Sequence, residues 1–256
     1  MHKLIGKAFI SGRIVVKTGL HIGGSKAILD IGGIDLSVIK TGGIPYIPGS
    51  SLKGKLRSIL AREEGSLAIK RDSEVPEDMA VDSEKLNLIF GKGADKESED
   101  GKKLIIPIKC QLTRLIVRDA LLDTEHFRDH FYDIKPGDDA AEDELVSYTE
   151  IKTENTINRI TGTAQHPRQL ERVPAGAEFD FEMIYSVFDE TEKVEHLNTL
   201  TQAMRILQDD YLGGSGSRGY GQICFENIKY EYKSIDDYMK GNNRQSLDLN
   251  GITTLD

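Results

Sequence analysis

The order of its apolar segments is the feature that most constrains the fold of this 256-residue chain. Alternating apolar and β-branched residues predict strands, whereas apolar residues three or four positions apart predict helices. The expected elements are a strand at 3–17, a helix at 51–64, strand character at 104–122, a strand at 178–188, a helix at 190–208 and a strand at 222–232. This order predicts an α+β fold with a ferredoxin-like βαββαβ core.

Long polar segments interrupt this core and are expected to be insertions within a single domain over 1–232. Two of them, at about 63–103 and 119–146, are strongly acidic. A third, at about 147–175, alternates threonine, isoleucine and charged residues, and has too few large apolar side chains to bury both faces. It is therefore expected to form a protruding hairpin. Residues 233–256 are polar and are expected to be a loosely ordered tail.

Charge is distributed unevenly along the chain. The net charge of −9 argues, taken alone, against a nucleic-acid-binding protein. Residues 1–62, however, hold ten Lys or Arg against two acidic residues, Asp30 and Asp35. Because a phosphate responds to charges within about 8 to 10 Å, a basic face can bind RNA although the whole chain is acidic. The acidic insertions would then face away from the RNA.

Nothing in the sequence predicts export or membrane insertion. The N-terminus has no apolar signal core, and no segment approaches the run of about 20 apolar residues that a membrane span needs. Cys110 and Cys224 are too far apart for a CxxC pair, and both are expected to be reduced, buried thiols. We therefore expect a cytoplasmic protein without a membrane partner.

The glycine-rich segment 212–221, LGGSGSRGYG, is a candidate phosphate-binding loop. It contains GxGxxG, but it follows a predicted helix and precedes a strand, the reverse of a dinucleotide fingerprint, and it lacks the Gly-Lys-Ser/Thr of a Walker loop. Its exposed amides, with Arg218, are suited to close approach of a phosphate backbone. A tight turn whose glycines only permit positive φ explains the glycines equally well.

The segment 47–57, IPGSSLKGKLR, combines a helix start with several cations. Ser50 or Ser51 is expected to cap the helix, whose N-terminus would attract an anion. Lys53 and Arg57 are four residues apart and share a helical face that can follow a phosphate strand. An ordinary capped surface helix would explain the serines and some of the lysines, but not the lack of acidic residues over 36–62.

Five segments, taken together, resemble a known family. GLHIGG at 19–24, IGGID at 31–35, IPGSSLKGKLR at 47–57 and LGGSGSRGYG at 212–221 occur in the order found in the RAMP superfamily of CRISPR proteins. More narrowly, they are similar to the multi-copy backbone subunit of the type III-A (Csm) effector complex. Residues 147–172 resemble the thumb region of that subunit.

This resemblance implies a modified RNA-recognition-motif core that assembles in several copies, with other Csm subunits, along a guide RNA (crRNA). It implies cleavage of single-stranded target RNA at regular intervals, with Mg²⁺ or another divalent cation. The target-cleaving residue would be the last of the IGxID motif, Asp35, and the thumb would wedge between base pairs. The residues expected to bind RNA are His21, Ser50, Ser51, Lys53, Lys55, Arg57, Arg159, Arg168, Arg172, Gly214, Gly216, Arg218 and Gly219.

Several chemical alternatives remain open at this stage. Asp35, kept ionised by nearby cations, would act either as a general base or as the anchor of a hydrated metal ion. A non-catalytic subunit that only holds the guide would not need this carboxylate. A metal-independent guide-processing nuclease would instead use His21. His126 and His130 have the spacing of a metal clip, but no third ligand is evident.

Overall fold

The computed structural model describes residues 3–24, 36–68, 80–81, 83–91, 112–135 and 146–255. Asp30, Asp35 and Cys110 lie outside the described residues. Cys224, expected to be buried, is free and only half-buried. Among the described residues, no helix is both long and apolar enough to cross a membrane.

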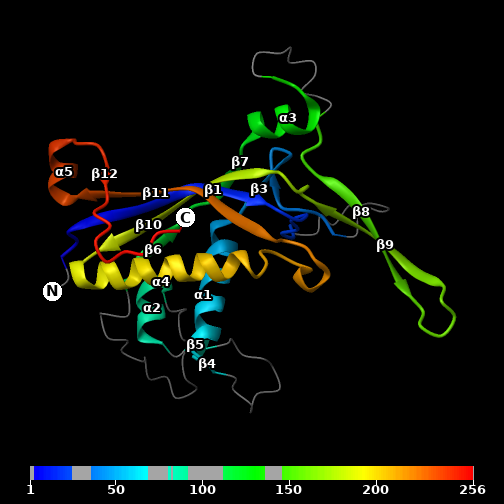
Figure 1. Cartoon of the computed structure of the whole chain (residues 1–256), viewed down its shortest axis with the longest axis horizontal. Helices are drawn as coiled ribbons and strands as arrows, with labels where there is room; N and C mark the ends of the chain where they lie inside the picture. The colour runs from blue at the N-terminus through cyan, green and yellow to red at the C-terminus, as the bar shows by residue number, and fades with distance from the viewer. Residues whose placement is uncertain are drawn as a thin grey trace, which may run out of the picture.

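The centre of the fold is an antiparallel sheet built around β1 (Gly6–Val16), which pairs on one side with β10 (Glu178–Val187) and on the other with β11 (Ile223–Ser234). The spatial order is β12-β11-β1-β10-β7-β3-β2, and β6 also pairs with β10 (Figure 1). The outer strands are β2 (Lys40–Thr41), β3 (Ile44–Ile47), β6 (Leu115–Val117), β7 (Ala120–Leu122) and β12 (Gln245–Ser246). The predicted α+β class is confirmed, and the strands of the central sheet pair antiparallel.

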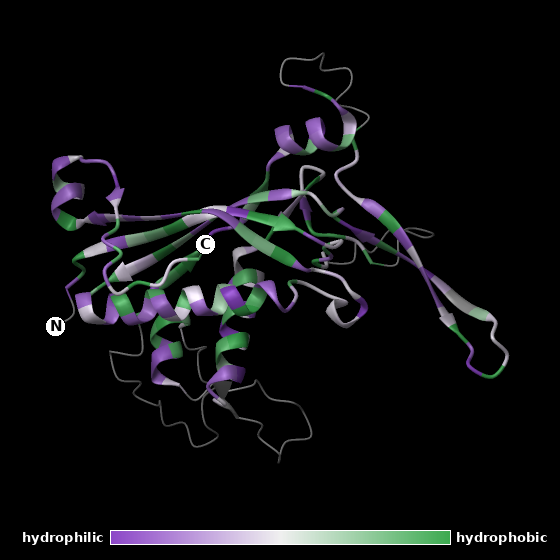
Figure 2. Cartoon of the chain, in the orientation of Figure 1, coloured by the Kyte–Doolittle hydropathy of each residue, from purple (hydrophilic) through white to green (hydrophobic). Residues whose placement is uncertain are grey.

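Helices α1 (Gly49–Glu63), α2 (Glu84–Phe90) and α4 (Glu190–Gln208) lie on one side of this sheet (Figure 1). Each strand facing them contributes alternate residues to the core, as a half-buried sheet requires. Fully buried members of this core include Ile14, Leu52, Leu56, Phe179, Leu200 and Leu207. Figure 2 shows hydrophobic residues along the central strands and on α1, whereas the surface helix α5 (Ile235–Lys240) is mostly hydrophilic.

Two projections leave this body. Strands β8 (Glu150–Ile157) and β9 (Ala164–Arg172) pair with each other and form the arm, a hairpin that extends away from the sheet (Figure 1). Helix α3 (Thr124–Tyr132) lies within the acidic segment that follows β7, and Phe127 anchors it. The short strands β4 (Leu67–Ala68) and β5 (Ala80–Val81) pair with each other.

The C-terminal segment is not the loosely ordered tail that the sequence predicts. Helix α5 (Ile235–Lys240) begins with a capping box formed by Ser234 and Asp237, and β12 then pairs with β11. Leu247, Ile252 and Leu255 are each less than 9% exposed, because they pack against the core. Burial of three large apolar side chains outweighs the polar composition of the segment.

Candidate nucleic-acid interface

Three of the sequence motifs meet at one end of the sheet. The glycine-rich segment 212–221 lies against residues 19–24, with the Gly214 amide 2.8 Å from the His21 carbonyl oxygen and the Gly221 amide 3.0 Å from that of Gly19. Leu20 pairs with Val173, at the base of the arm. Segments nearly 200 residues apart in sequence are therefore joined by backbone hydrogen bonds, which fix their positions relative to the arm.

The glycines of this segment are required by the turn, whereas phosphate binding by them stays a prediction. Gly213 has φ +79°, and a Cβ there would lie 2.3 Å from the His21 carbonyl oxygen. At Gly216, in the 3-10 turn Gly216–Arg218, a Cβ would overlap the Tyr211 ring at 2.0 Å. The turn geometry therefore requires glycine, while Arg218 and Gly219 remain exposed and Gly214 and Gly216 are partly exposed.

His21 is almost fully buried, at 6% exposure. Its Nδ1 lies 2.7 Å from the Glu171 carbonyl oxygen, within hydrogen-bonding distance. The opposite edge of the ring faces Gly23 and Gly214, neither of which has a side chain to cover it. His21 thus connects the motif 19–24 to the arm through Nδ1, and its Nε2 edge lies next to the two glycines.

The carboxylate of Glu171 is the central polar group at the base of the arm. It accepts hydrogen bonds from the Val38 amide at 2.9 Å, from Thr149 Oγ1 at 2.6 Å and from the ammonium group of Lys40. Burial alone would raise the pKa of Glu171, but these hydrogen bonds outweigh burial and lower the pKa. The carboxylate therefore stays charged at neutral pH.

The same residue also holds the chain just after Asp35. The Glu171 amide donates to the Leu36 carbonyl oxygen at 3.0 Å. The chain before and after residues 25–35 is paired as well, with Gly24 N to Ser37 O at 3.0 Å and Ile39 N to Ile22 O at 2.9 Å. Leu36, the residue next to Asp35 in sequence, is thereby attached to the arm.

Tyr220 forms a second connection between the glycine-rich segment and the arm. Its ring is 2% exposed, and its hydroxyl donates to Glu154 Oε1 on β8 at 2.7 Å. Lys152 Nζ lies 4.5 Å from the ring centroid, and the guanidinium of Arg172 lies 5.2 Å from it. The hydrogen bond from Tyr220 lowers the pKa of Glu154, while burial and the same bond raise the pKa of Tyr220. Cation–π contacts and this hydrogen bond hold the arm against the loop.

Tyr220→Phe should lower the free energy of unfolding by about 1 kcal/mol, because it leaves Glu154 without its buried donor. Chemical denaturation would measure the change, and hydrogen exchange should show faster opening of β8. Tyr132→Phe is a matched control, since that hydroxyl bonds to Ser147 but the residue is 40% exposed and water can replace the bond. Equal losses in the two variants would contradict a clamp at Tyr220.

Three cations of α1 contact other parts of the chain. Lys53 Nζ donates to the Leu115 carbonyl oxygen at 2.8 Å, and Arg57 donates to Asn87 Oδ1 at 3.0 Å. Lys55 forms an ion pair with Asp210 at 2.9 Å and lies over the Tyr211 ring. Burial lowers the pKa values of Lys53 and Arg57. These contacts position the cations inside the fold, and RNA binding by them stays a prediction.

The start of α1 differs from the sequence prediction. The helix begins at Gly49 after Pro48, so neither Ser50 nor Ser51 is the capping residue; both lie in the first turn. The Gly49 amide instead donates to Asp119 Oδ1 at 2.8 Å. A carboxylate from a segment 70 residues away therefore occupies the position at which an anion was expected to bind.

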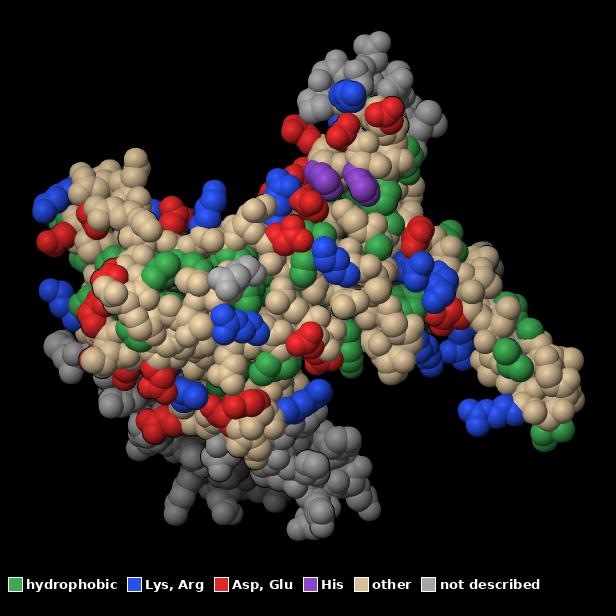
Figure 3. Space-filling model, viewed as in Figure 1, with side chains coloured by type: hydrophobic (Ala, Val, Ile, Leu, Met, Phe, Trp, Pro, Cys, Tyr) green, Lys and Arg blue, Asp and Glu red, His purple; other side chains and the backbone are tan. Residues whose placement is uncertain are grey.

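The arm carries the remaining predicted cations. Arg159 lies in the turn at its tip and Arg168 lies on β9, both exposed, whereas Arg172 pairs with Glu150 at 2.7 Å near the base. Figure 3 shows Lys and Arg side chains gathered at the base of the arm and acidic side chains around α3. Several cations at the base of the arm are paired with acidic side chains, as in Lys40 with Glu171 and Arg172 with Glu150, so separate basic and acidic surfaces stay a prediction.

A metal clip on α3 is not completed by a third ligand. The rings of His126 and His130 stack with centroids 5.5 Å apart, and His126 Nε2 lies 3.4 Å from Glu178. Within the described ranges, no group of three or more His, Cys, Asp or Glu is arranged to hold a metal ion.

The sequence did not indicate the roles of Glu171, Tyr220 and Lys40 at the base of the arm. Tyr220 nevertheless lies within the glycine-rich motif, and Glu171 lies within the thumb motif.

Comparison with known proteins identifies the family. The pattern of the RAMP superfamily matches residues 13–224. A Streptococcus thermophilus protein described as "CRISPR system Cms endoribonuclease Csm3" is 40% identical over 244 residues, covering 91% of this chain and 96% of the relative. A Methanocaldococcus jannaschii protein of the same description is 38% identical, covering 98% of this chain and 91% of the relative.

A solved structure is also similar. It is the crystal structure of a Csm3–Csm4 subcomplex in the type III-A CRISPR-Cas interference complex, with a TM-score of 0.53 and 29% identity. The match covers 95% of this chain and 90% of the compared chain. The chain therefore belongs to the RAMP superfamily. Within it, the resemblance to the backbone subunit of type III-A complexes is confirmed by these Csm3 relatives.

Proposed function

We propose that this chain is the crRNA-binding backbone subunit of a type III-A CRISPR complex and an endoribonuclease that cleaves target RNA paired to the guide. The observation that carries the proposal is the meeting of residues 19–24, the glycine-rich segment 212–221 and the base of the arm, next to the chain that follows Asp35. The printed descriptions of the relatives support the same activity.

We infer a ferredoxin-like arrangement for the core. Strands β11, β1, β10 and β7 are adjacent in that order, and α1 and α4 are the two crossover helices. A βαββαβ chain placed in this order brings the loop after β1 and the loop before β11 to the same end of the sheet. The two motif-bearing loops meet there, which supports the inference.

The chemistry that suits a single carboxylate is transesterification of RNA. Asp35 would accept the proton of a target 2′-hydroxyl as this oxygen attacks the adjacent phosphorus. The bond to the 5′-oxygen would break, leaving a 2′,3′-cyclic phosphate and a 5′-hydroxyl that takes its proton from solvent. If Asp35 instead anchors a divalent cation, Mg²⁺ in the simplest case, that cation would neutralise phosphate charge, with RNA phosphate oxygens and water as its other ligands.

The arm supports the proposed partners. Ile151, Ile157 and Ile160 are 57%, 63% and 95% exposed, and apolar side chains so exposed on an extended hairpin are suited to contact another molecule. We propose that the arm reaches the guide–target duplex and the next copy of the chain in a filament, alongside other Csm subunits, in the cytoplasm. Guide processing by His21 is less well supported, because that residue is buried and bonded through Nδ1.

Cleavage by the reconstituted guide-bound complex tests the proposal. With Mg²⁺, complementary target RNA should yield evenly spaced products with cyclic phosphate ends, and EDTA should abolish them. A target without complementarity to the guide is the control and should remain intact. Cleavage that survives EDTA would overturn the metal requirement, and absence of guide-dependent cleavage at every Mg²⁺ concentration would overturn the nuclease assignment.

A further inference from the structure

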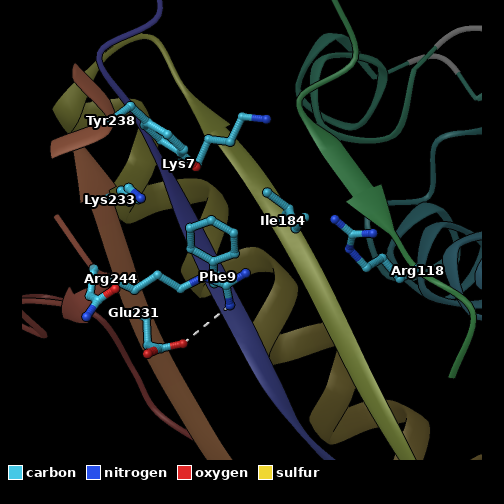
Figure 4. Close-up of a pocket in the computed structure, with 9 residues that line it drawn as sticks. Lys7, Phe9, Arg118, Ile184, Glu231, Lys233, Tyr238 and Arg244 are labelled. Carbon is cyan, nitrogen blue, oxygen red and sulfur yellow. Dashed lines mark ion pairs between the residues drawn. The ribbon is translucent and has the colours of Figure 1, made fainter. Parts of the chain in front are cut away.

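A depression of about 550 Å³ lies on the face of the sheet that α1, α2 and α4 do not cover. Its lining includes Lys7 and Phe9 of β1, Ile184 of β10, Glu231 and Lys233 of β11, and Tyr238 and Arg244 from the C-terminal segment (Figure 4). Phe9 and Ile184 are direct neighbours in the pairing of β1 with β10, as are Lys7 and Lys233 in that of β1 with β11. In Figure 1, α5, which borders the depression, and the arm lie at opposite ends of the sheet.

An arginine stacked on an aromatic ring forms the floor of this depression. The Arg244 guanidinium carbon lies 3.6 Å from the centroid of the Phe9 ring. Arg244 Nη1 pairs with Glu182 at 2.6 Å and contacts Glu231 at 3.5 Å. Its side chain is still 36% exposed. A guanidinium held in this way offers its open side to a planar group, since arginine stacks on aromatic rings and bases alike.

Two ammonium groups stand next to this stack without a carboxylate partner. Lys7 and Lys233 are opposite each other on neighbouring strands, and neither forms an ion pair among the residues that the structure describes. Lys233 Nζ lies 4.5 Å from the Tyr238 ring. Like charges directly opposite in a sheet destabilise it. An anion placed between the two lysines would remove this repulsion.

We propose that the depression binds one nucleotide of single-stranded RNA, with its phosphate between Lys7 and Lys233 and its base on Arg244. Stacking surfaces beside cations are typical of single-stranded nucleic-acid sites. The volume lies in the range of small-ligand pockets and accommodates a nucleotide. An acidic peptide would use the lysines but leave the stacking surface of Arg244 empty. This site is separate from the interface at the glycine-rich segment and the arm, and gives the chain a second RNA contact.

Photocrosslinking of the full chain tests the site. A tetranucleotide carrying 5-bromouridine should crosslink at Tyr238, which is 42% exposed at the rim, and mass spectrometry would locate the adduct. The variant Lys7→Glu with Lys233→Glu should reduce this adduct at least tenfold and lower the slope of log affinity against log salt by about 0.7, as expected for one lost phosphate contact. The matched control, Lys3→Glu with Lys229→Glu, makes the same charge change at exposed lysines outside the lining.

A second variant separates stacking from charge. Arg244→Lys keeps the cation but removes the planar group, so the adduct should fall about tenfold while the salt slope stays unchanged. Equal adduct yields in the native chain and the Lys7/Lys233 variant would overturn the proposal. So would displacement by a poly-glutamate peptide but not by unlabelled RNA, which would assign the surface to an acidic protein. Because guide-dependent cleavage is measured separately, failure here leaves the proposed function unaffected.

Discussion

Asp35→Ala should abolish cleavage of guide-paired target RNA while leaving target binding intact. If the carboxylate is the general base, its loss costs about 100- to 10,000-fold in rate. If it anchors the cation, the loss is of similar size and should be partly relieved at high Mg²⁺ concentration. The measurement is single-turnover cleavage of labelled target by the reconstituted complex, with binding followed by electrophoretic mobility.

Asp30→Asn is the matched control for this experiment. It removes a carboxylate five residues away, from the same basic and glycine-rich stretch, but outside the IGxID motif. The Asp30→Asn complex should cleave target RNA at the native rate and give the same evenly spaced products. Unchanged cleavage products for Asp35→Ala would show that another residue or subunit carries out the cleavage and that this chain only binds the guide. Loss of target binding by the same variant would instead assign Asp35 a structural role.

Glu171→Ala should loosen the connection between the arm and the chain that follows Asp35, because it removes the side-chain bonds and leaves only the backbone pairing with Leu36. The carboxylate is buried and bonded to Lys40, Thr149 and the Val38 amide, so its removal should lower the free energy of unfolding by about 3 kcal/mol. Cleavage should fall at least tenfold, because Val38 and Lys40 lose their side-chain contacts with the arm, although the backbone bond from residue 171 to Leu36 remains. Chemical denaturation, hydrogen exchange at Val38 and the cleavage rate would together measure the effect.

Two comparison variants sharpen this prediction. Glu150→Ala removes an ion pair with Arg172 at the same end of the arm, but Glu150 is 46% exposed, so the cost should not exceed about 1 kcal/mol. Glu171→Gln keeps an acceptor for the Val38 amide without the charge and should fall between native and Glu171→Ala. If Glu150→Ala and Glu171→Ala lowered the free energy of unfolding equally, the structural role assigned to the Glu171 carboxylate at the base of the arm would be wrong.

The contribution of the Glu171 carboxylate to stability depends on pH because its pKa is lowered in the folded chain. A carboxylate whose pKa is lower in the folded than in the unfolded chain stabilises the fold above the unfolded value of about 4.3. That contribution is lost as the pH falls through the lower, folded value. The stability difference between native chain and Glu171→Ala should therefore be constant near neutral pH and shrink below about pH 4.

The main elements of the core were predictable because each carries its own periodicity. The helix expected at 190–208 is α4, and the strands expected at 178–188 and 222–232 are β10 and β11 within two residues. The C-terminal segment was mispredicted because its anchors, Leu247, Ile252 and Leu255, are too irregularly spaced to show a pattern. Their burial depends on contacts with Tyr230 of β11, whose carbonyl and hydroxyl oxygens accept from the Leu247 and Leu255 amides.

The sequence motifs identified the residues of the candidate site but not the contacts between them. Residues 19–24 and 212–221 were both singled out, yet nothing local in either indicates that their backbones pair. Asp119 could not be foreseen as the partner of the α1 N-terminus, because that contact depends on how β7 passes the helix. The sequence also could not show that three cations of α1 contact other parts of the chain, namely Lys53, Lys55 and Arg57. A cation with a partner inside the protein and a cation that faces a phosphate look the same in a sequence.

The arm is held at its base, whereas its tip is exposed, with Ile160 95% exposed, so a small rotation at the base would be amplified at the tip. A strand of eight residues spans about 26 Å, so a rotation of about 10° at the base would displace the tip by about 5 Å. That displacement is close to the step from one nucleotide to the next. We therefore expect Glu171 and Tyr220 to set the angular stiffness of the arm, so that loosening either contact makes the cleavage positions less regular before it weakens RNA binding.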